Sequence, residues 1–278
     1  GPENGFTTMA RLDVGRMMNL RGRQKDAVAE LEEVLAIRIR VDGAGNYWVQ
    51  ETRSALAEAL LATGNLDRAQ LLVDEALTAS ASKPKQNIRT LLLRTRAAVA
   101  RQQHRMQDAL NDVEAAEQIN EGIQGPGSLR AATLLAARGE TLLGLGRVDE
   151  AVAVLGEARK LLTRTETDPH RPEQMNVRIA MAMAQSAAGQ RETARQQIMS
   201  VLDELGALPG REELWLLEEH AQQELAAVLF AQGKTDPACN ALDAAMALRQ
   251  SRSLADDARL TKMAAQRSSK GCRSMRVI

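Results

Sequence analysis

Residues 139–158 read GETLLGLGRVDEAVAVLGEA, and this stretch decides the fold. A small residue, Gly139, is followed seven positions later by Gly146, five later again by Ala151, and four later by Leu155. Glycine ends a helix readily, because it adopts the left-handed conformation without the penalty that a Cβ brings. The small residues on either side of the turn let two helices approach closely. The stretch therefore predicts a helical hairpin with its turn at Gly146.

The same spacing recurs through nearly the whole chain. Successive turn residues lie 42, 40, 42, 43 and 44 positions apart, at Gly22, Gly64, His104, Gly146, Gly189 and Gly233. Five residues after each turn stands an alanine, and four further stands an aliphatic residue: Ala27 and Leu31, Ala69 and Val73, Ala109 and Val113, Ala151 and Leu155, Ala194 and Ile198, Ala238 and Leu242. His104 replaces glycine once, and histidine adopts positive φ more often than most residues. Six copies in register indicate an array of repeats.

The spacing also predicts where each helix lies. First helices are expected at 6–20, 47–62, 87–102, 128–144, 172–187 and 211–231, and second helices at 24–40, 66–79, 106–120, 148–163, 191–205 and 235–249. The six repeats then span 6–40, 47–79, 87–120, 128–163, 172–205 and 211–249. An amphipathic stretch within 251–267 predicts a capping helix, because the end of a repeat array needs a polar outer side. Residues 268–278 are expected to form a disordered basic tail.

The composition favours an all-α class. Apolar residues make up 44% of the chain, but aromatic residues only 2%, so Ala, Leu, Val and Met must fill the interior. Such side chains suit closely packed helices, whereas sheets favour β-branched and aromatic residues.

The charges balance, with 36 Lys and Arg against 36 Asp and Glu, so no global field attracts nucleic acid or an anionic membrane. From Arg259 onward the chain is basic, without an acid after Asp257. A solvated tail is the simpler interpretation of this segment. Binding of an anionic partner is the alternative.

Cys239 and Cys272 lie in unlike contexts, one in a periodic helix and one in the polar tail, and we therefore expect no disulfide framework. The chain has no apolar run near 18 residues and no signal segment, so we expect a soluble protein, in the cytoplasm by preference. Gly1-Pro2 resembles a protease-cleavage scar, so residues 1–5 are interpreted as a cloning linker and the natural protein as longer.

The hairpin pattern resembles the tetratricopeptide repeat over residues 6–250. The usual period is about 34 residues, and the longer period here resembles the kinesin-light-chain type. Residues 35–38 leading to Gly43, and the loop at 168–172, match that type. The resemblance implies an α-α superhelix, a right-handed solenoid of six hairpins that binds a protein or peptide. It is also similar to arrays appended to bacterial kinases and transcription regulators. HEAT and armadillo repeats rank second, since neither explains a glycine followed five residues later by alanine.

The sequence contains no constellation typical of catalysis or of metal binding. His104, His170 and His220 stand in three different repeats without a metal-ligand partner at the right spacing. Neither cysteine has the neighbours of a nucleophile. We therefore expect no enzyme activity, no metal and no cofactor.

In such an array the first helices line a concave groove. Positions two, three, six, ten and thirteen before each turn residue are expected to face it, and they predict these partner-binding residues: Arg16, Asn19, Glu51, Ser54, Glu58, Arg94, Arg101, Thr133, Glu140, Asn176 and Gln223.

Two interpretations of Arg94 and Arg101 are open. They lie seven residues apart on one helical face, and together with Arg16 they could grip a carboxylate. Alternatively, Arg94 and Arg101 pair with Glu58 and Glu140 on the flanking helices, which adds little net stability.

The rare aromatic residues are candidate anchors for a partner. Tyr47 and Trp48 stand at the start of the second repeat, and Trp215 stands near the start of the first helix of the sixth repeat. Each is a potential hot spot if it is exposed. Burial between hairpins is the more common fate of such residues.

The functional prediction is a non-catalytic module that binds a peptide or partner protein in its groove. The alternative is a sensory or regulatory domain of a larger bacterial signalling protein. Self-association through the ends of the array is a third hypothesis.

Overall fold

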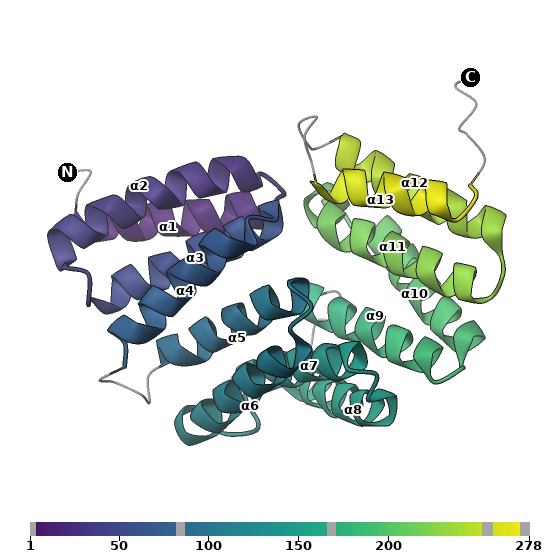
Figure 1. Ribbon diagram of the computed structural model, residues 1–278, viewed down its shortest axis with the longest axis horizontal. Helices are drawn as coiled ribbons and strands as arrows, with labels where there is room; N and C mark the ends of the chain where they lie inside the picture. The colour runs from purple at the N-terminus through teal and green to yellow at the C-terminus, as the bar shows by residue number, and fades with distance from the viewer. Residues whose placement is uncertain (1–3, 82–86, 166–170, 252–257, 273–278) are drawn as a thin grey trace. The chain divides into compact units, whose positions relative to one another are not determined.

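The computed structural model describes residues 4–81, 87–165, 171–251 and 258–272. The proposed cloning scar at 1–2, the loop at 168–170 and the tail from 273 lie outside these ranges. The described residues form helices and no strand. Two compact units divide the chain, residues 1–167 and 168–278, here called unit 1 and unit 2 (Figure 1).

Unit 1 contains four helical hairpins. Its helices are α1 (Gly5–Leu20), α2 (Gln24–Asp42), α3 (Tyr47–Thr63), α4 (Leu66–Ala79), α5 (Asn87–Gln102), α6 (Met106–Ile123), α7 (Leu129–Gly144) and α8 (Val148–Thr165). Each odd-numbered helix packs against the helix that follows it, and each even-numbered helix from α2 to α6 packs against the next hairpin.

Unit 2 contains two hairpins and one further helix. Its elements are α9 (Pro172–Ala187), α10 (Arg191–Ala207), the 3-10 turn η1 (Arg211–Leu214), α11 (Trp215–Ala231), α12 (Thr235–Gln250) and α13 (Ala258–Ser269). The hairpin helices of both units lie within three residues of the predicted bounds, except that a 3-10 turn precedes α11. α13 extends to Ser269, two residues beyond the predicted end of the capping helix.

The turns follow the predicted chemistry. All six turn residues have positive φ, including His104 at 61°, the one non-glycine residue with positive φ in the described ranges. At Gly64, φ is 81° and the amide donates back to Leu61 at 3.2 Å, which closes α3. Because the turn residue adopts a left-handed φ and ψ, the chain reverses direction within a few residues and the second helix begins directly after the turn.

The repeated small and aliphatic residues form the core. The alanine and the aliphatic residue after each turn are fully buried in all six copies: Ala27, Leu31, Ala69, Val73, Ala109, Val113, Ala151, Leu155, Ala194, Ile198, Ala238 and Leu242. Their regular burial explains why so few aromatic residues suffice. The described residues contain no helix that is both long and apolar enough to cross a membrane.

A disulfide joins Cys239 of α12 to Cys272, with a Cα–Cα distance of 5.7 Å. The expectation that these two cysteines form no disulfide is therefore wrong. The unlike sequence contexts misled the prediction, because α13 folds back along α12 and carries the following residues to the start of that helix (Figure 1).

Candidate protein-interaction surface

The first helices of unit 1 lie next to one another. The backbone of α3 approaches those of α1 and α5, and α5 approaches α7, whereas consecutive second helices lie further apart. The closer spacing of the first helices places them on the inside of the curve that the hairpins make. We call the surface of α1, α3, α5 and α7 the inner face of unit 1.

Arg–Glu ion pairs connect consecutive first helices across this inner face. Arg16 Nη2 of α1 lies 3.0 Å from Glu51 Oε1 of α3. Glu58 Oε1 of α3 accepts a hydrogen bond from Arg94 Nη2 of α5 at 2.6 Å. We call the contact between two consecutive first helices a junction. The first junction, α1 with α3, and the second, α3 with α5, therefore each hold one cation and one anion.

The third junction follows the same rule. Arg101 Nη2 of α5 lies 3.0 Å from Glu140 Oε2 of α7, and Arg101 Nη1 donates to the Ala137 carbonyl at 3.1 Å. Arg94 and Arg101 therefore pair with glutamates of the flanking helices in the structure, as the second of the two interpretations has it. A carboxylate ligand would have to displace Glu58 or Glu140. Because all these side chains are partly exposed, each pair contributes only about 0–1 kcal/mol.

Other predicted groove residues differ in accessibility. Ser54 is completely buried, with its Oγ 3.3 Å from Thr95 Oγ1 of α5, so its predicted place on the open groove is wrong. A serine is too short to pass the neighbouring helix, whereas Arg94 at the same repeat position reaches beyond it. Thr133 is half-buried and donates to the Arg130 carbonyl at 2.9 Å. The Asn19 Oδ1 atom is buried without a hydrogen-bond donor.

Two aromatic side chains are exposed at the start of α3. Tyr47 is 40% exposed and Trp48 is 43% exposed, and their rings meet edge to face at 5.2 Å. The Arg38 guanidinium lies 5.5 Å from the Trp48 ring and donates to the Trp48 carbonyl at 2.8 Å. Partial burial raises the pKa of the Tyr47 phenol, and the nearby Glu51 carboxylate adds to the shift. Tyr47 stands four residues before Glu51 in α3, so the two side chains lie on the same side of the helix.

Trp215 is buried and cannot contact a partner. It is 2% exposed, and the Arg249 guanidinium lies 5.5 Å from its ring. Arg249 also forms a buried ion pair with Glu219, at 2.7 Å from Nε to Oε1 and 2.6 Å from Nη2 to Oε2. Of the two interpretations of Trp215, an exposed anchor or a buried side chain, the structure has burial: the ring packs against the Arg249 guanidinium, which forms a buried ion pair with Glu219.

In unit 2 the predicted groove residues Asn176 and Gln223 contact other side chains of the same unit. Asn176 Oδ1 of α9 lies 3.4 Å from His220 Nδ1 of α11, the counterpart of the junctions in unit 1. Gln223 Nε2 donates to Glu219 Oε1 at 2.7 Å and lies 3.2 Å from Met263 Sδ of α13. α13 therefore covers Gln223 instead of leaving it open to a partner.

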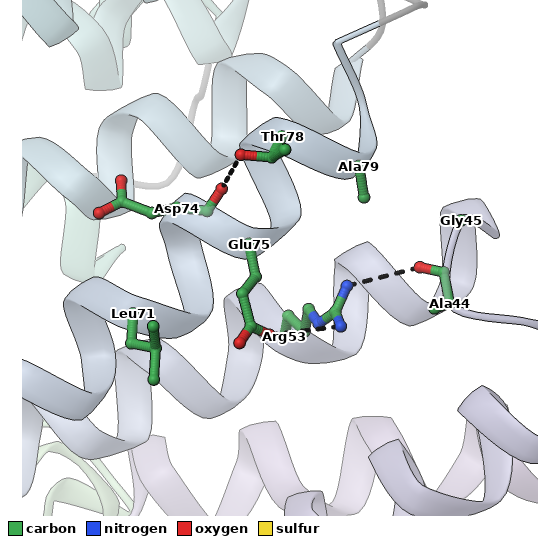
Figure 2. A pocket seen from close by; sticks show the side chains of 8 residues that line it. All are labelled: Ala44, Gly45, Arg53, Leu71, Asp74, Glu75, Thr78 and Ala79. Atoms are coloured by element: carbon green, nitrogen blue, oxygen red, sulfur yellow. Dashed lines mark hydrogen bonds and ion pairs between the residues drawn. The ribbon is translucent and has the colours of Figure 1, made fainter.

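A cavity of about 530 Å³ lies on unit 1 between the α2–α3 connection and α4 (Figure 2). Its lining residues are Ala44, Gly45, Arg53, Leu71, Asp74, Glu75, Thr78 and Ala79. Arg53 Nη1 donates to Gln50 Oε1 at 3.0 Å and to the Ala44 carbonyl at 3.4 Å, and Arg53 Nη2 lies 3.3 Å from Glu75 Oε2. The Thr78 hydroxyl donates to the Asp74 carbonyl at 2.8 Å, so no activated nucleophile faces this cavity.

The sequence interpretation missed Arg53, although a signal existed. Arg11, Arg53 and Arg178 all stand eleven residues before their turn residue. Each pairs with a glutamate of the second helix of its own hairpin, at 2.6 Å from Glu30, 3.3 Å from Glu75 and 2.6 Å from Glu204. The described residues contain no group of three or more His, Cys, Asp or Glu placed to hold a metal ion.

The geometry defines a class of protein: stacked helical hairpins whose first helices form one face. Sequence comparison agrees, because a tetratricopeptide-repeat model matches residues 88–164, and a second one matches residues 50–75 and 175–198. Tetratricopeptide-repeat models therefore match segments in both units of the chain. No curated protein matches the sequence.

Solved structures share the fold. A protein of Podosopora anserina, described as a kinesin light chain with nearly identical repeats, aligns with TM-score 0.54 and 20% identity over 69% of this chain and 92% of that one. A Rap protein complexed with Competence and Sporulation Factor gives TM-score 0.63 and 12% identity over 94% and 72% of the two chains. The quorum sensor NprR from B. thuringiensis aligns with TM-score 0.57 and 15% identity, over 94% of this chain and 70% of that one. The prediction of an all-α solenoid of tetratricopeptide-like hairpins is confirmed.

Proposed function

We propose that this chain is a non-catalytic interaction module that holds an extended peptide or a partner helix against the inner face of unit 1. The observation that carries the proposal is the exposed Tyr47–Trp48 pair at the start of α3, where Tyr47 stands four residues before Glu51, the partner of Arg16. Exposed aromatic side chains supply much of the binding energy at protein interfaces. The solved complexes of the Rap protein with Competence and Sporulation Factor and of NprR with its cognate peptide NprX support a peptide as the class of ligand.

The charges of the inner face limit the partner's chemistry. Arg16, Arg94 and Arg101 are each paired with a glutamate, so the face carries little net charge at these junctions. We therefore expect a partner with an apolar or aromatic side chain over Tyr47 and few charges of one sign. Arg16, Glu58, Arg94, Arg101 and Glu140 then contribute to orientation more than to affinity.

A random-peptide phage library panned on the chain tests this function. Peptides enriched on the wild-type chain are measured by calorimetry against Tyr47→Ala, Trp48→Ala and the matched control Leu71→Ala, an exposed apolar residue outside the inner face. We expect the aromatic variants to weaken binding about tenfold or more, the effect of removing a hot spot, and the control to leave it unchanged. Equal binding by all three variants, or no enriched peptide, contradicts the proposal.

Self-association is a second candidate because α1 has an exposed apolar stripe. Phe6 is 81% exposed, and Val14, Met17 and Leu20 are exposed along the same helix. The residues 42 positions after Val14 and Met17 are Leu56 and Ala59, which are buried in α3. A second copy covering α1 would bury the stripe. Light scattering over a hundredfold concentration range tests this: the mass should rise for the wild-type chain and stay monomeric for Met17→Lys. A regulatory role within a larger signalling protein stays a prediction.

A further inference from the structure

α13 closes the end of unit 2 and is tied there by a covalent bond. The helix lies along α12 (Figure 1). The Cys239–Cys272 disulfide joins α12 to the residue three positions after α13 ends. Met263 of α13 is buried in one cluster with Leu229 of α11 and Met246 of α12. The helix therefore shields an apolar surface formed by the last hairpin.

That surface is the one on which a following hairpin would dock. In unit 1, Ser54 stands ten residues before its turn and contacts Thr95 of the next first helix. Gln223 stands ten residues before its own turn and contacts Met263 of α13. α13 thus occupies the place of a next first helix, and its removal would leave the end of the array open.

Among the described side chains of α13 only Met263 is buried, and the others are partly or fully exposed. Leu260 packs against the same cluster as Met263, and Arg267 Nε lies 2.5 Å from Asp243 Oδ1 in the last turn of the helix. Lys270, just beyond the helix, lies 5.5 Å from the Phe230 ring. A helix of 12 residues is marginally stable in water without packing. A disulfide spanning 33 residues favours the docked state roughly 100- to 1,000-fold by restricting the loop.

We propose that the Cys239–Cys272 disulfide is a redox-sensitive latch, whose reduction by a dithiol releases α13 and uncovers the apolar end of unit 2. Cys272 is the more exposed of the two cysteines, so one thiolate of the reductant attacks its Sγ atom. The S–S bond breaks, and Cys239 leaves as a thiolate that takes up a proton. The second thiol of the reductant then displaces Cys272. The protein gains two thiols, and the reductant becomes a cyclic disulfide. Release exposes Leu229, Phe230 and Met246, which other apolar helices can then contact.

Hydrogen exchange followed by mass spectrometry tests the latch on the full chain. Without reductant, iodoacetamide should add to no cysteine, and peptides covering α13 should be protected. With dithiothreitol, two alkyl groups should add, and exchange in α13 should accelerate at least tenfold while exchange in unit 1 stays the same. Alkylation of both cysteines before reduction, or unchanged exchange in α13 after it, overturns the proposal.

Variants separate the covalent bond from the contacts. Cys272→Ser should give fast α13 exchange without reductant, and circular dichroism should show that the hairpins remain folded. The matched control, Arg267→Ala, removes the ion pair with Asp243 but keeps the disulfide, so its α13 should stay protected until reduction. If oxidised Arg267→Ala exchanges as fast as Cys272→Ser, the contacts and not the disulfide hold the helix, and the proposal is wrong. The comparison of wild-type protein with and without dithiothreitol decides the question even if Cys272→Ser fails to fold.

Discussion

Leu155 of α8 packs directly on the backbone of Gly139 in α7, so closely that a Cβ added to Gly139 would lie 2.5 Å from Leu155 Cγ. Gly15 and Leu31 of the first hairpin repeat this relationship, at 2.7 Å. In these two hairpins the glycine seven positions before the turn therefore accommodates the leucine of its own second helix. This contact sets how closely the two helices of a hairpin approach.

Gly139→Ala should destabilise unit 1 although alanine is the better helix former. We expect a loss of about 1–3 kcal/mol from overpacking against Leu155. Leu155→Ala alone should also destabilise, but Gly139→Ala should cost much less in that background because the space is then free. Urea unfolding measures the cycle. The control is Gly122→Ala, a helical position where an added Cβ meets nothing within 4 Å. Strict additivity of the two changes would argue against the contact.

His104→Gly should stabilise the third hairpin. A non-glycine residue in the left-handed region costs about 1 kcal/mol, and His104 has φ 61°. Its ring is exposed, so little packing is lost. Part of the gain is offset because glycine makes the unfolded chain more flexible. Calorimetry should therefore show a Tm higher by a few degrees, whereas Gly64→His at the equivalent turn should lower it. A decrease in Tm for His104→Gly would mean that the ring has contacts of its own.

Exchanging the charges of the Arg101–Glu140 pair should separate its contribution to the stability of the fold from its role in binding. Arg101→Glu places two carboxylates together and should cost about 1 kcal/mol. The double variant Arg101→Glu with Glu140→Arg restores opposite charges and should recover most of that loss, as measured by Tm. Peptides selected on the wild-type chain should then bind the double variant more weakly if these side chains orient the ligand. Failure of the double variant to recover Tm would contradict the importance of this pair.

Acid should weaken the first hairpin through Glu30. Hydrogen bonds from Arg11, at 2.6 and 3.0 Å, lower the pKa of Glu30 below its ordinary value of 4.5, while burial opposes them. A carboxylate with a lowered pKa contributes stability above its unfolded pKa and loses it as the pH falls through the folded pKa. Glu30→Gln should therefore cost about 1 kcal/mol near neutral pH. The difference from wild type should shrink below pH 4.5 and vanish once Glu30 is protonated.

Unfolding curves of both proteins across this pH range measure the effect. The control is Glu33→Gln, because Glu33 contacts the same Arg11 at 2.6 Å but is largely exposed, so its loss should cost less at every pH. A constant difference between wild type and Glu30→Gln down to the most acidic pH would show that the pair does not act through ionisation.

Local chemistry in the sequence determined the hairpins. A left-handed residue at positions such as Gly64, small residues where helices cross, and buried aliphatic residues at fixed spacing act over a few turns of helix, so the helix bounds could be predicted within a few residues. The same spacing identified Glu58, Arg94, Arg101 and Glu140 as residues of one face. It could not choose between free arginines and paired ones, because that choice depends on the distance between neighbouring helices.

Only the tertiary structure decided which side chains meet across the chain. Trp215 is buried where the guanidinium of Arg249, 34 residues later, lies over its ring and pairs with Glu219. Cys239 and Cys272 pair because α13 folds back along α12. Neither contact leaves a periodic signal, since each occurs once and depends on how separate helices pack. The repeat thus fixed the scaffold, and non-repeated tertiary contacts decided what the scaffold buries, what it exposes and how its end is closed.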